Sequence, residues 1–179
     1  MLAIPSVHPY ATVRIASPAD LTAVREVADT TWHATYREIL SKATIDAFLR
    51  RFYSDYRILA AVNDGGLWVL EEDGRVVGYE RLSMRGDVGY IGAIYVLPES
   101  QRLGHGRRLI DTARPWFAAR GASEIRLTVA EHNHAARGFY RHLGFEEREA
   151  VDTQLMGEPL AERVCVLRLL QPYLFRSQS

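Results

Sequence analysis

The stretch IYVLPESQRLGHGRRLI, residues 94–110, predicts a strand that runs through a tight turn into a helix. Its β-branched and aromatic residues come first, and the apolar face of a helix expected from about Gly104 to Arg120 follows. A helix start presents unpaired backbone N–H groups and the positive end of the helix dipole. Positive charge is added there by Arg102, Arg107 and Arg108. The turn is therefore predicted to bind phosphate or pyrophosphate.

Two common phosphate-binding motifs do not fit this turn. A P-loop needs a glycine followed by Lys and then Ser or Thr, which neither Gly104 nor Gly106 provides. A dinucleotide-binding turn needs a third glycine three residues after Gly106, where this chain has Leu109. Taken alone, this stretch also fits an alternative to phosphate binding: a strand-to-helix turn whose glycines serve only to make the turn tight.

Outward from this stretch, strand patterns alternate with helix patterns. Strands are predicted at 12–16, 67–71, 76–84, 88–96, 124–129, 145–151 and 163–169, and further helices from Ser17, at 43–56 and at 133–143. Pro115 lies inside the helix that follows the glycine turn and is expected to kink or split it. We predict one α/β domain over residues 11–170, a loose extension at 1–10 and a tail at 171–179.

The composition is that of a globular protein with balanced charge. Among 179 residues, Lys and Arg number 22 and Asp and Glu also 22, which argues against nucleic acid as a partner. No apolar run approaches the ~20 residues that cross a bilayer, and the first ten residues do not resemble a signal peptide. The single cysteine, Cys165, excludes an internal disulfide and favours a reducing compartment. We therefore expect a cytoplasmic protein that binds neither membranes nor nucleic acid.

Two separated motifs resemble those of one known family. Residues 96–106 are similar to the acyl-coenzyme A-binding motif of the GCN5-related N-acetyltransferase (GNAT) superfamily, in which a strand precedes Gln or Arg, two residues, Gly, one residue, and Gly or Ala. Residues 133–145 match its pattern N-x-x-A-x-x-F-Y-x-x-x-G-F. The resemblance runs from about Thr12 to Leu169. It implies a single-domain α/β fold with a mixed, mostly antiparallel central sheet flanked by helices and an acyl-CoA cleft between two splayed central strands.

The resemblance also implies the donor and the residues that bind it. Acetyl-CoA is expected as co-substrate, its pyrophosphate on backbone N–H groups of the turn and its pantetheine arm against the preceding strand. No metal is expected, since His132 and His134 have no third ligand nearby. The cofactor-binding residues implied are Ile94, Tyr95, Val96, Gln101, Arg102, Leu103, Gly104, His105, Gly106, Arg107, Asn133 and Tyr140.

Acyl transfer to an amine requires a proton to leave the amine and a proton to reach the departing thiolate. Tyr140 matches the family tyrosine that serves as general acid, with a core aromatic as the plainer interpretation. The base is harder to assign, because Tyr90 stands where many family members carry Glu. Glu80 is the nearest carboxylate that could reach the cleft, or it faces solvent in an alternating strand; His33 is a second candidate. We predict Tyr140 and Glu80 as catalytic residues.

Aromatic residues of the first two helices are predicted to wall the acceptor side, although core packing explains part of this enrichment. We assign acceptor binding to Trp32, Tyr36 and Tyr90. The predicted function is transfer of an acetyl group from acetyl-CoA to a primary amine of a small molecule, by direct attack in a ternary complex. Acetylation of a protein N-terminus or lysine, and a non-catalytic acyl-CoA sensor, are the alternatives. Small domains of this kind often pair, so a homodimer is also considered.

Overall fold

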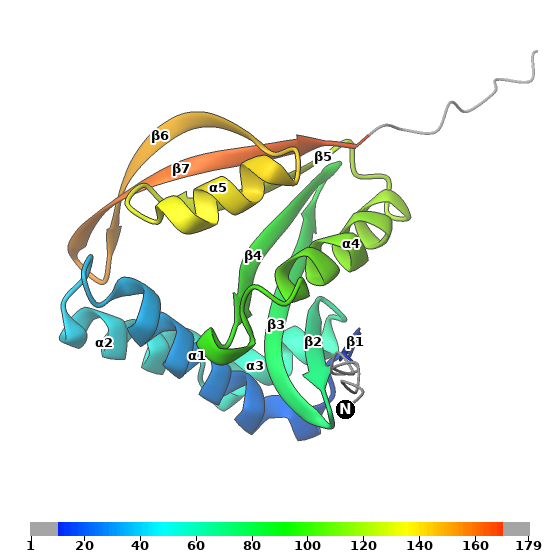
Figure 1. The fold of residues 1–179 in the computed structure, drawn as a ribbon, viewed down its shortest axis with the longest axis horizontal. Coiled ribbons are helices and arrows are strands. Elements are labelled where there is room, and N and C mark those ends of the chain that lie inside the picture. The colour runs from blue at the N-terminus through cyan, green and yellow to red at the C-terminus, as the bar shows by residue number, and fades with distance from the viewer. Residues whose placement is uncertain (1–10, 170–179) are drawn as a thin grey trace, which may run out of the picture.

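The computed structural model describes residues 11–169, which form one seven-stranded sheet with helices on both faces (Figure 1). In chain order the elements are β1 (Ala11–Ile15), η1 (Pro18–Asp20), α1 (Leu21–Tyr36), α2 (Lys42–Phe52), α3 (Asp55–Asn63), β2 (Leu67–Glu72), β3 (Arg75–Arg85), β4 (Val88–Val96), η2 (Pro98–Ser100), α4 (His105–Ala118), β5 (Glu124–Ala130), α5 (His134–His142), β6 (Glu146–Leu155) and β7 (Glu158–Arg168), where η marks a 3₁₀ helix. The extension predicted at 1–10 and the tail predicted at 171–179 lie outside the described residues.

The strands of the sheet follow the order β1-β2-β3-β4-β5-β7-β6. Every neighbouring pair is antiparallel except β4 and β5, which run parallel. A parallel pair needs a crossover connection, and α4 lies in that crossover. The expected mixed, mostly antiparallel sheet is therefore confirmed.

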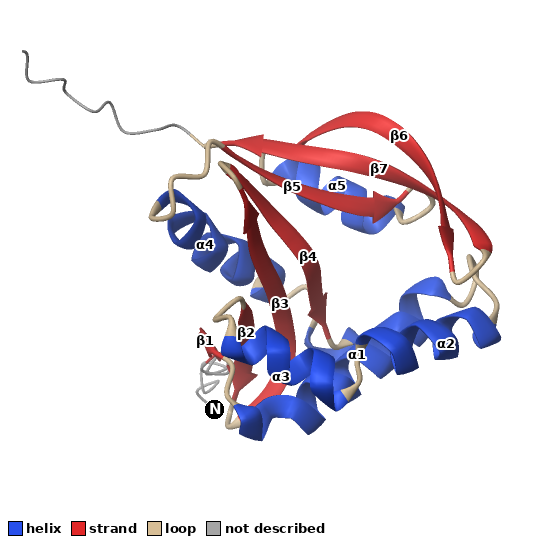
Figure 2. Cartoon of the chain, turned by 180° about the vertical axis from the view of Figure 1, so that it is seen from behind, coloured by secondary structure: helices blue, strands red, loops and turns tan. Residues whose placement is uncertain are grey.

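Each face of the sheet has its own hydrophobic core. Helices α1, α2 and α3 lie on one side, where Val24 and Tyr79 are buried, and α4 and α5 lie on the other, where Phe117 and Tyr140 are buried (Figures 1 and 2). Ile94 of β4 packs against both clusters, so the centre of β4 lies where the two cores meet. Within residues 11–169, no helix has both the length and the apolar composition to cross a membrane.

The central strands β4 and β5 pair over a short distance only. Three residue pairs join them: Val88–Glu124, Gly89–Ile125 and Tyr90–Arg126. Beyond these pairs the strands diverge toward their C-terminal ends, while β4 stays paired with β3 and β5 with β7 (Figure 1). The splayed central strands expected from the sequence are therefore confirmed.

The second helix differs from its prediction. The apolar spacing predicts one helix at 43–56, but α2 ends at Phe52 and α3 begins at Asp55. Between them Ser54 has extended backbone angles (φ −66°, ψ 155°) and takes the N-cap position of α3. Serine is common at that position, although the Ser54 side chain makes no capping hydrogen bond within the described residues. Helical spacing of apolar residues continues across the break, so periodicity does not reveal it.

Two other boundaries also differ. Pro115 does not split α4, which continues to Ala118. Pro115 lies on the exposed side of the helix, where water can satisfy the carbonyl that loses its partner. The last two strands are longer than the predicted 145–151 and 163–169, because they form one hairpin whose turn contains Met156 and Gly157, both with positive φ.

Gly89 is required for packing of α4 on the sheet. A Cβ atom at Gly89 would overlap the ring of Phe117, which is fully buried. We expect Gly89→Ala to lower the free energy of unfolding by about 1–3 kcal/mol, measured by urea denaturation. Gly92→Ala, three residues along the same strand, is the control, because its Cβ would meet nothing closer than 3.9 Å. Equal midpoints for the two variants would contradict the packing role.

Candidate active site

The turn before α4 is built from left-handed backbone. Arg102 has φ 65° and Gly104, the N-cap of α4, has φ 84°. The first helical hydrogen bond runs from Arg108 N to the Gly104 carbonyl oxygen (3.0 Å), so the N–H groups of the first turn before Arg108 have no intrahelical acceptor. Residues 101–104 are exposed. The turn therefore presents free N–H groups to solvent at the positive end of the dipole, as expected for an anion site.

His105 contributes to this turn through its backbone, because its side chain is buried. Its Nε2 atom lies 2.9 Å from Oε1 of Glu72 at the end of β2. The hydroxyl of Ser100 donates to the other oxygen of the same carboxylate (3.1 Å). Glu72 thus fixes both sides of the turn to the sheet. On the strand side, Gln101 Nε2 donates to the carbonyl of Val96 (2.9 Å).

The two glycines of the turn have different roles. A Cβ on Gly104 would meet nothing within 4 Å, so Gly104 is needed for its positive φ. A Cβ on Gly106 would stand 3.0 Å from Cζ of Phe139 on α5. Gly106 therefore leaves room for the ring of Phe139, which brings α5 against the first turn of α4.

Strand β4 has a backbone edge that no strand pairs with where β5 has diverged, and on it only the Val96 carbonyl has a side-chain partner in the described residues, Gln101. Leu97 N donates to the carbonyl of Val77 on β3 (2.8 Å). Because backbone groups alternate in direction along a strand, those of Tyr95 also face β3, and those of Ile94 and Val96 face the open side. Of the three residues assigned to pantetheine, Ile94 and Val96 present their N–H groups to that side. Tyr95 instead packs its ring near Tyr79, 5.7 Å between centroids.

Helix α5 carries Asn133 and Tyr140 beside this opening. Asn133 caps the helix, since its Oδ1 accepts from Ala136 N (3.1 Å). Tyr140 is 8% exposed and packs between Phe139 and Phe145. Its hydroxyl has no hydrogen-bond partner within residues 11–169. Burial raises the pKa of Tyr140 above its ordinary value, so the hydroxyl stays protonated and able to donate.

Glu80 does not reach a solvent-filled space. Its register partners are Trp68 and Ile94, none of its surface is exposed, and neither carboxylate oxygen has a hydrogen-bond partner in the described part of the chain. Burial raises the pKa of Glu80 to about 9. The carboxyl group is therefore protonated at neutral pH in the free protein. The alternative that Glu80 faces solvent is therefore wrong. Its carboxyl lies close enough to Tyr140 to contribute to the raised pKa of that hydroxyl, and its catalytic role stays a prediction.

The aromatic residues assigned to the acceptor are only partly brought together. Trp32 is buried and stacks on Tyr36 (4.4 Å between centroids) and on Phe48 (4.0 Å). Burial raises the pKa of Tyr36 to about 12. Tyr90 lies apart, in the paired half of β4, with the Arg85 guanidinium 5.1 Å from its ring centroid.

The second candidate base, His33, makes its side-chain contact with the neighbouring helix. His33 Nε2 lies 3.1 Å from Asp46 Oδ1, a contact between α1 and α2. Tyr56 is 80% exposed on α3. Tyr53 and Tyr79 join the aromatic cluster through Phe48, with a 2.7 Å hydrogen bond from the Tyr79 hydroxyl to that of Tyr53. Sequence reasoning missed both tyrosines, because one lies in the unpredicted helix break and the other in a strand.

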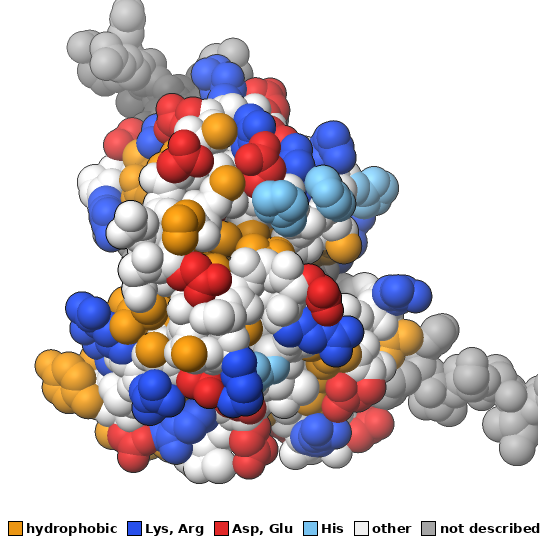
Figure 3. All heavy atoms as spheres, turned by 90° about the vertical axis from the view of Figure 1, so that its left-hand side faces the viewer, with side chains coloured by type: hydrophobic (Ala, Val, Ile, Leu, Met, Phe, Trp, Pro, Cys, Tyr) orange, Lys and Arg blue, Asp and Glu red, His pale blue; other side chains and the backbone are white. Residues whose placement is uncertain are grey.

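Hydrogen bonds between Ser41 and Glu158, a contact called the strap below, join the two sides of the molecule next to α2. Ser41, between α1 and α2, donates from its backbone N to Glu158 Oε1 (3.0 Å) and from its hydroxyl to Oε2 (2.9 Å). Glu158 is the first residue of β7, at the hairpin with β6. Figure 3 views the molecule from this side. The surface is narrower at mid-height, between an upper part that contains β6 and β7 and a lower part that contains α1 and α2. Neither Ser41 nor Glu158 carried a sequence signal for this contact.

These features define an α/β protein with an anion-binding helix start beside an open strand edge. The model of the acetyltransferase (GNAT) family matches residues 31–145. The mycothiol acetyltransferase of Thermomonospora curvata is 36% identical over 97 residues, 52% of this chain, and the chain spans only 32% of that protein's length. The spermidine N(1)-acetyltransferase of Thermoplasma acidophilum is 27% identical over 140 residues, covering 75% of this chain and 87% of that protein.

Solved structures share the fold. The PaiA N-acetyltransferase of Thermoplasma acidophilum, in complex with coenzyme A, has a TM-score of 0.76 at 23% identity, covering 89% of this chain and 99% of that one. Since the family model matches more than half of the residues, the chain belongs to the acetyltransferase (GNAT) family.

Proposed function

We propose that the protein transfers the acetyl group of acetyl-CoA to a primary amine of a small molecule, by direct attack in a ternary complex. The observation that carries this proposal is the placement of the open β4 edge between the α4 helix start and the α5 tyrosine. Relatives named for spermidine and mycothiol support a small acceptor. So does a pocket of about 320 Å³ on the opposite face of β4, near the lower end of the range typical of small-molecule sites.

In this proposal the donor spans from the turn to the strand edge. The pyrophosphate binds the free N–H groups of the first turn of α4, with Arg102 and Arg107 adding charge. The pantetheine amides pair with backbone groups of Ile94 and Val96, as a neighbouring strand would. An N–H group of this edge also polarises the thioester carbonyl.

The reaction then balances as follows. The amine nitrogen attacks the thioester carbonyl carbon, an N–C bond forms, and the C–S bond breaks to release the thiolate of coenzyme A. An ammonium acceptor first releases one proton to water, and the attacking nitrogen loses a second. We assign these protons to water rather than Glu80, because the Glu80 carboxyl is protonated at neutral pH. The thiolate receives a hydrogen bond or a proton from Tyr140, which regains it from water.

Donor binding is tested by the melting temperature. Acetyl-CoA at about 100 times its dissociation constant adds roughly 2.7 kcal/mol to stability, which raises Tm by several degrees. We expect Gly104→Ala to lose most of this shift, because its left-handed backbone forms the turn. Gly121→Ala is the matched control: Gly121 also has positive φ (76°) with open space around it, but lies after the C-terminal end of α4.

Both glycine variants should be destabilised to a similar degree, by about 1–2 kcal/mol, so only their response to acetyl-CoA differs. Absence of any shift in the unmodified protein at millimolar acetyl-CoA would refute the proposed donor site. Release of free thiol across a panel of amines then tests catalysis.

A further inference from the structure

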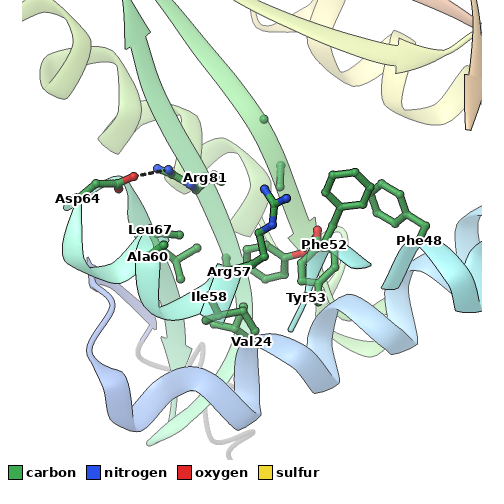
Figure 4. Close-up of a pocket in the computed structure, with 14 residues that line it drawn as sticks. Val24, Phe48, Phe52, Tyr53, Arg57, Ile58, Ala60, Asp64, Leu67 and Arg81 are labelled. Carbon is green, nitrogen blue, oxygen red and sulfur yellow. Dashed lines mark hydrogen bonds and ion pairs between the residues drawn. The ribbon is translucent and has the colours of Figure 1, made fainter. Parts of the chain in front are cut away.

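A pocket lies between α2 and α3 on one side and β3 and β4 on the other, on the sheet face opposite α4. Its volume is about 320 Å³, and the residues that give it its chemistry are Phe48, Phe52, Tyr53, Arg57, Arg81 and Ala93. Figure 4 shows the Phe48 and Phe52 rings side by side at one end and Arg57 extending from α3 toward β4. Behind Phe48, the stacked ring of Trp32 holds it in place.

The pocket has one positive charge without a counter-charge. Arg81 is neutralised by an ion pair with Asp64, which also lines the pocket. Arg57 makes no ion pair and no hydrogen bond with any residue in the described range 11–169. Its guanidinium lies 5.7 Å from the ring centroid of Phe52, so it is positioned by an aromatic face and not by a carboxylate. A guanidinium held in this way keeps its N–H donors available.

The pocket also adjoins the site of acyl transfer. Ala93 lines it, and the next residue along β4, Ile94, presents its backbone to the open edge. A molecule in this pocket therefore approaches β4 from the side of α3, while the pyrophosphate turn lies at the start of α4 on the other face. An amine reaching past Ala93 would meet the thioester at the strand edge.

Building on the acetyl transfer proposed above, we infer that the acceptor is a small amino carboxylate with an apolar body. Arg57 binds the carboxylate, Phe52 and Phe48 contact the apolar part, and the amine points past Ala93. A guanidinium matches a carboxylate in shape as well as charge, because two parallel N–H donors meet its two oxygens. A polyamine would instead place further positive charge beside Arg57, at an energetic cost.

The test compares amine acceptors with and without a carboxylate. Acetylation rates with acetyl-CoA are measured for L-phenylalanine, L-phenylalaninamide, phenethylamine and spermidine. We expect kcat/KM for L-phenylalanine to exceed that for its amide about 10- to 100-fold, as for hydrogen bonds to charged groups. Arg57→Ala should abolish this preference, chiefly through KM. Arg51→Ala is the matched control, since Arg51 lies 5.6 Å from the same Phe52 ring without lining the pocket, and it should keep the preference.

Charge reversal provides a second readout. Arg57→Glu should favour spermidine and the amide over the free amino acid, and its melting shift with acetyl-CoA shows that it is folded. Turnover of several amines with no preference for the carboxylate, or equal effects of Arg57→Ala and Arg51→Ala, would overturn the acceptor class and leave the acetyltransferase proposal intact. Turnover of none of the amines, with no melting shift on acetyl-CoA, would reject both.

Discussion

Tyr140→Phe is expected to lower kcat by about 100-fold or more, the typical contribution of a positioned proton donor. The substitution removes one oxygen atom whose hydroxyl has no partner in the described structure, so the fold should not change. The raised pKa of Tyr140 means that the hydroxyl is neutral throughout the working pH range. It also widens the gap to the pKa of a thiol, which favours a strong hydrogen bond to the developing thiolate over complete proton transfer.

The control for this prediction is Tyr56→Phe, since Tyr56 is 80% exposed on α3 and outside the site. It should match the unmodified protein in every measurement. Tyr140→Phe should retain the full melting shift with acetyl-CoA while losing turnover. An unchanged kcat would remove Tyr140 from the chemistry, and loss of the melting shift would instead assign it to donor binding.

Stability is expected to fall as pH rises from about 5 to about 9, because of Glu80. Its folded pKa of about 9 lies above the ordinary value of 4.5. Between these values the folded state holds one proton that the unfolded state has lost, so unfolding becomes easier as pH rises. The decline from this single group is up to about 1.4 kcal/mol per pH unit. This decline in stability is absent below the pKa of Glu80 in the unfolded state and levels off above its pKa in the folded state.

Glu80→Gln isolates this contribution. Urea unfolding is measured at several pH values. As pH rises, the free energy of unfolding of the variant should increase relative to that of the unmodified protein, because Gln has no proton to lose. Glu38→Gln, on a side chain 85% exposed, should follow the unmodified curve. Parallel curves for all three proteins would show that Glu80 ionises normally. The same variant decides the base: loss of turnover at neutral pH in Glu80→Gln would restore Glu80 as a proton acceptor.

Local patterns predicted most of the fold. The glycine turn, the three strands before it and the helix at 133–143 each depend on residues close together in sequence, where turn chemistry and periodicity act directly. The break between α2 and α3 was not predicted, because the extended backbone of Ser54 ends the helix without interrupting the apolar spacing. The full length of the β6–β7 hairpin was not predicted either: Met156 gives no turn signal, and Gly157 beside it is a single glycine that does not show how far the two strands extend.

The site was predictable to a similar extent. The motif predicted the local backbone geometry around Ile94, Val96 and Gly104, because a motif describes a local geometry; their roles in donor binding stay predictions. The directions of side chains did not. Glu80 faces a sealed core and His33 faces solvent between two helices, and both directions depend on which elements cover each face. Arg57 carried no signal at all, because an unpaired charge is recognised only after the partners of its neighbours are known.

The contact between Ser41 and Glu158 has a consequence for the order of folding. These residues are 117 positions apart in the chain, so their hydrogen bonds close one of the longest loops in the protein. The entropy lost in closing such a loop must be offset by contacts formed earlier. The contacts of the turn before α4 span much shorter separations, 28 and 33 residues to Glu72, so this turn can be ordered once β2, β3 and β4 have paired. The half of the protein that binds the donor is therefore expected to assemble early, and the strap near the acceptor side to close last.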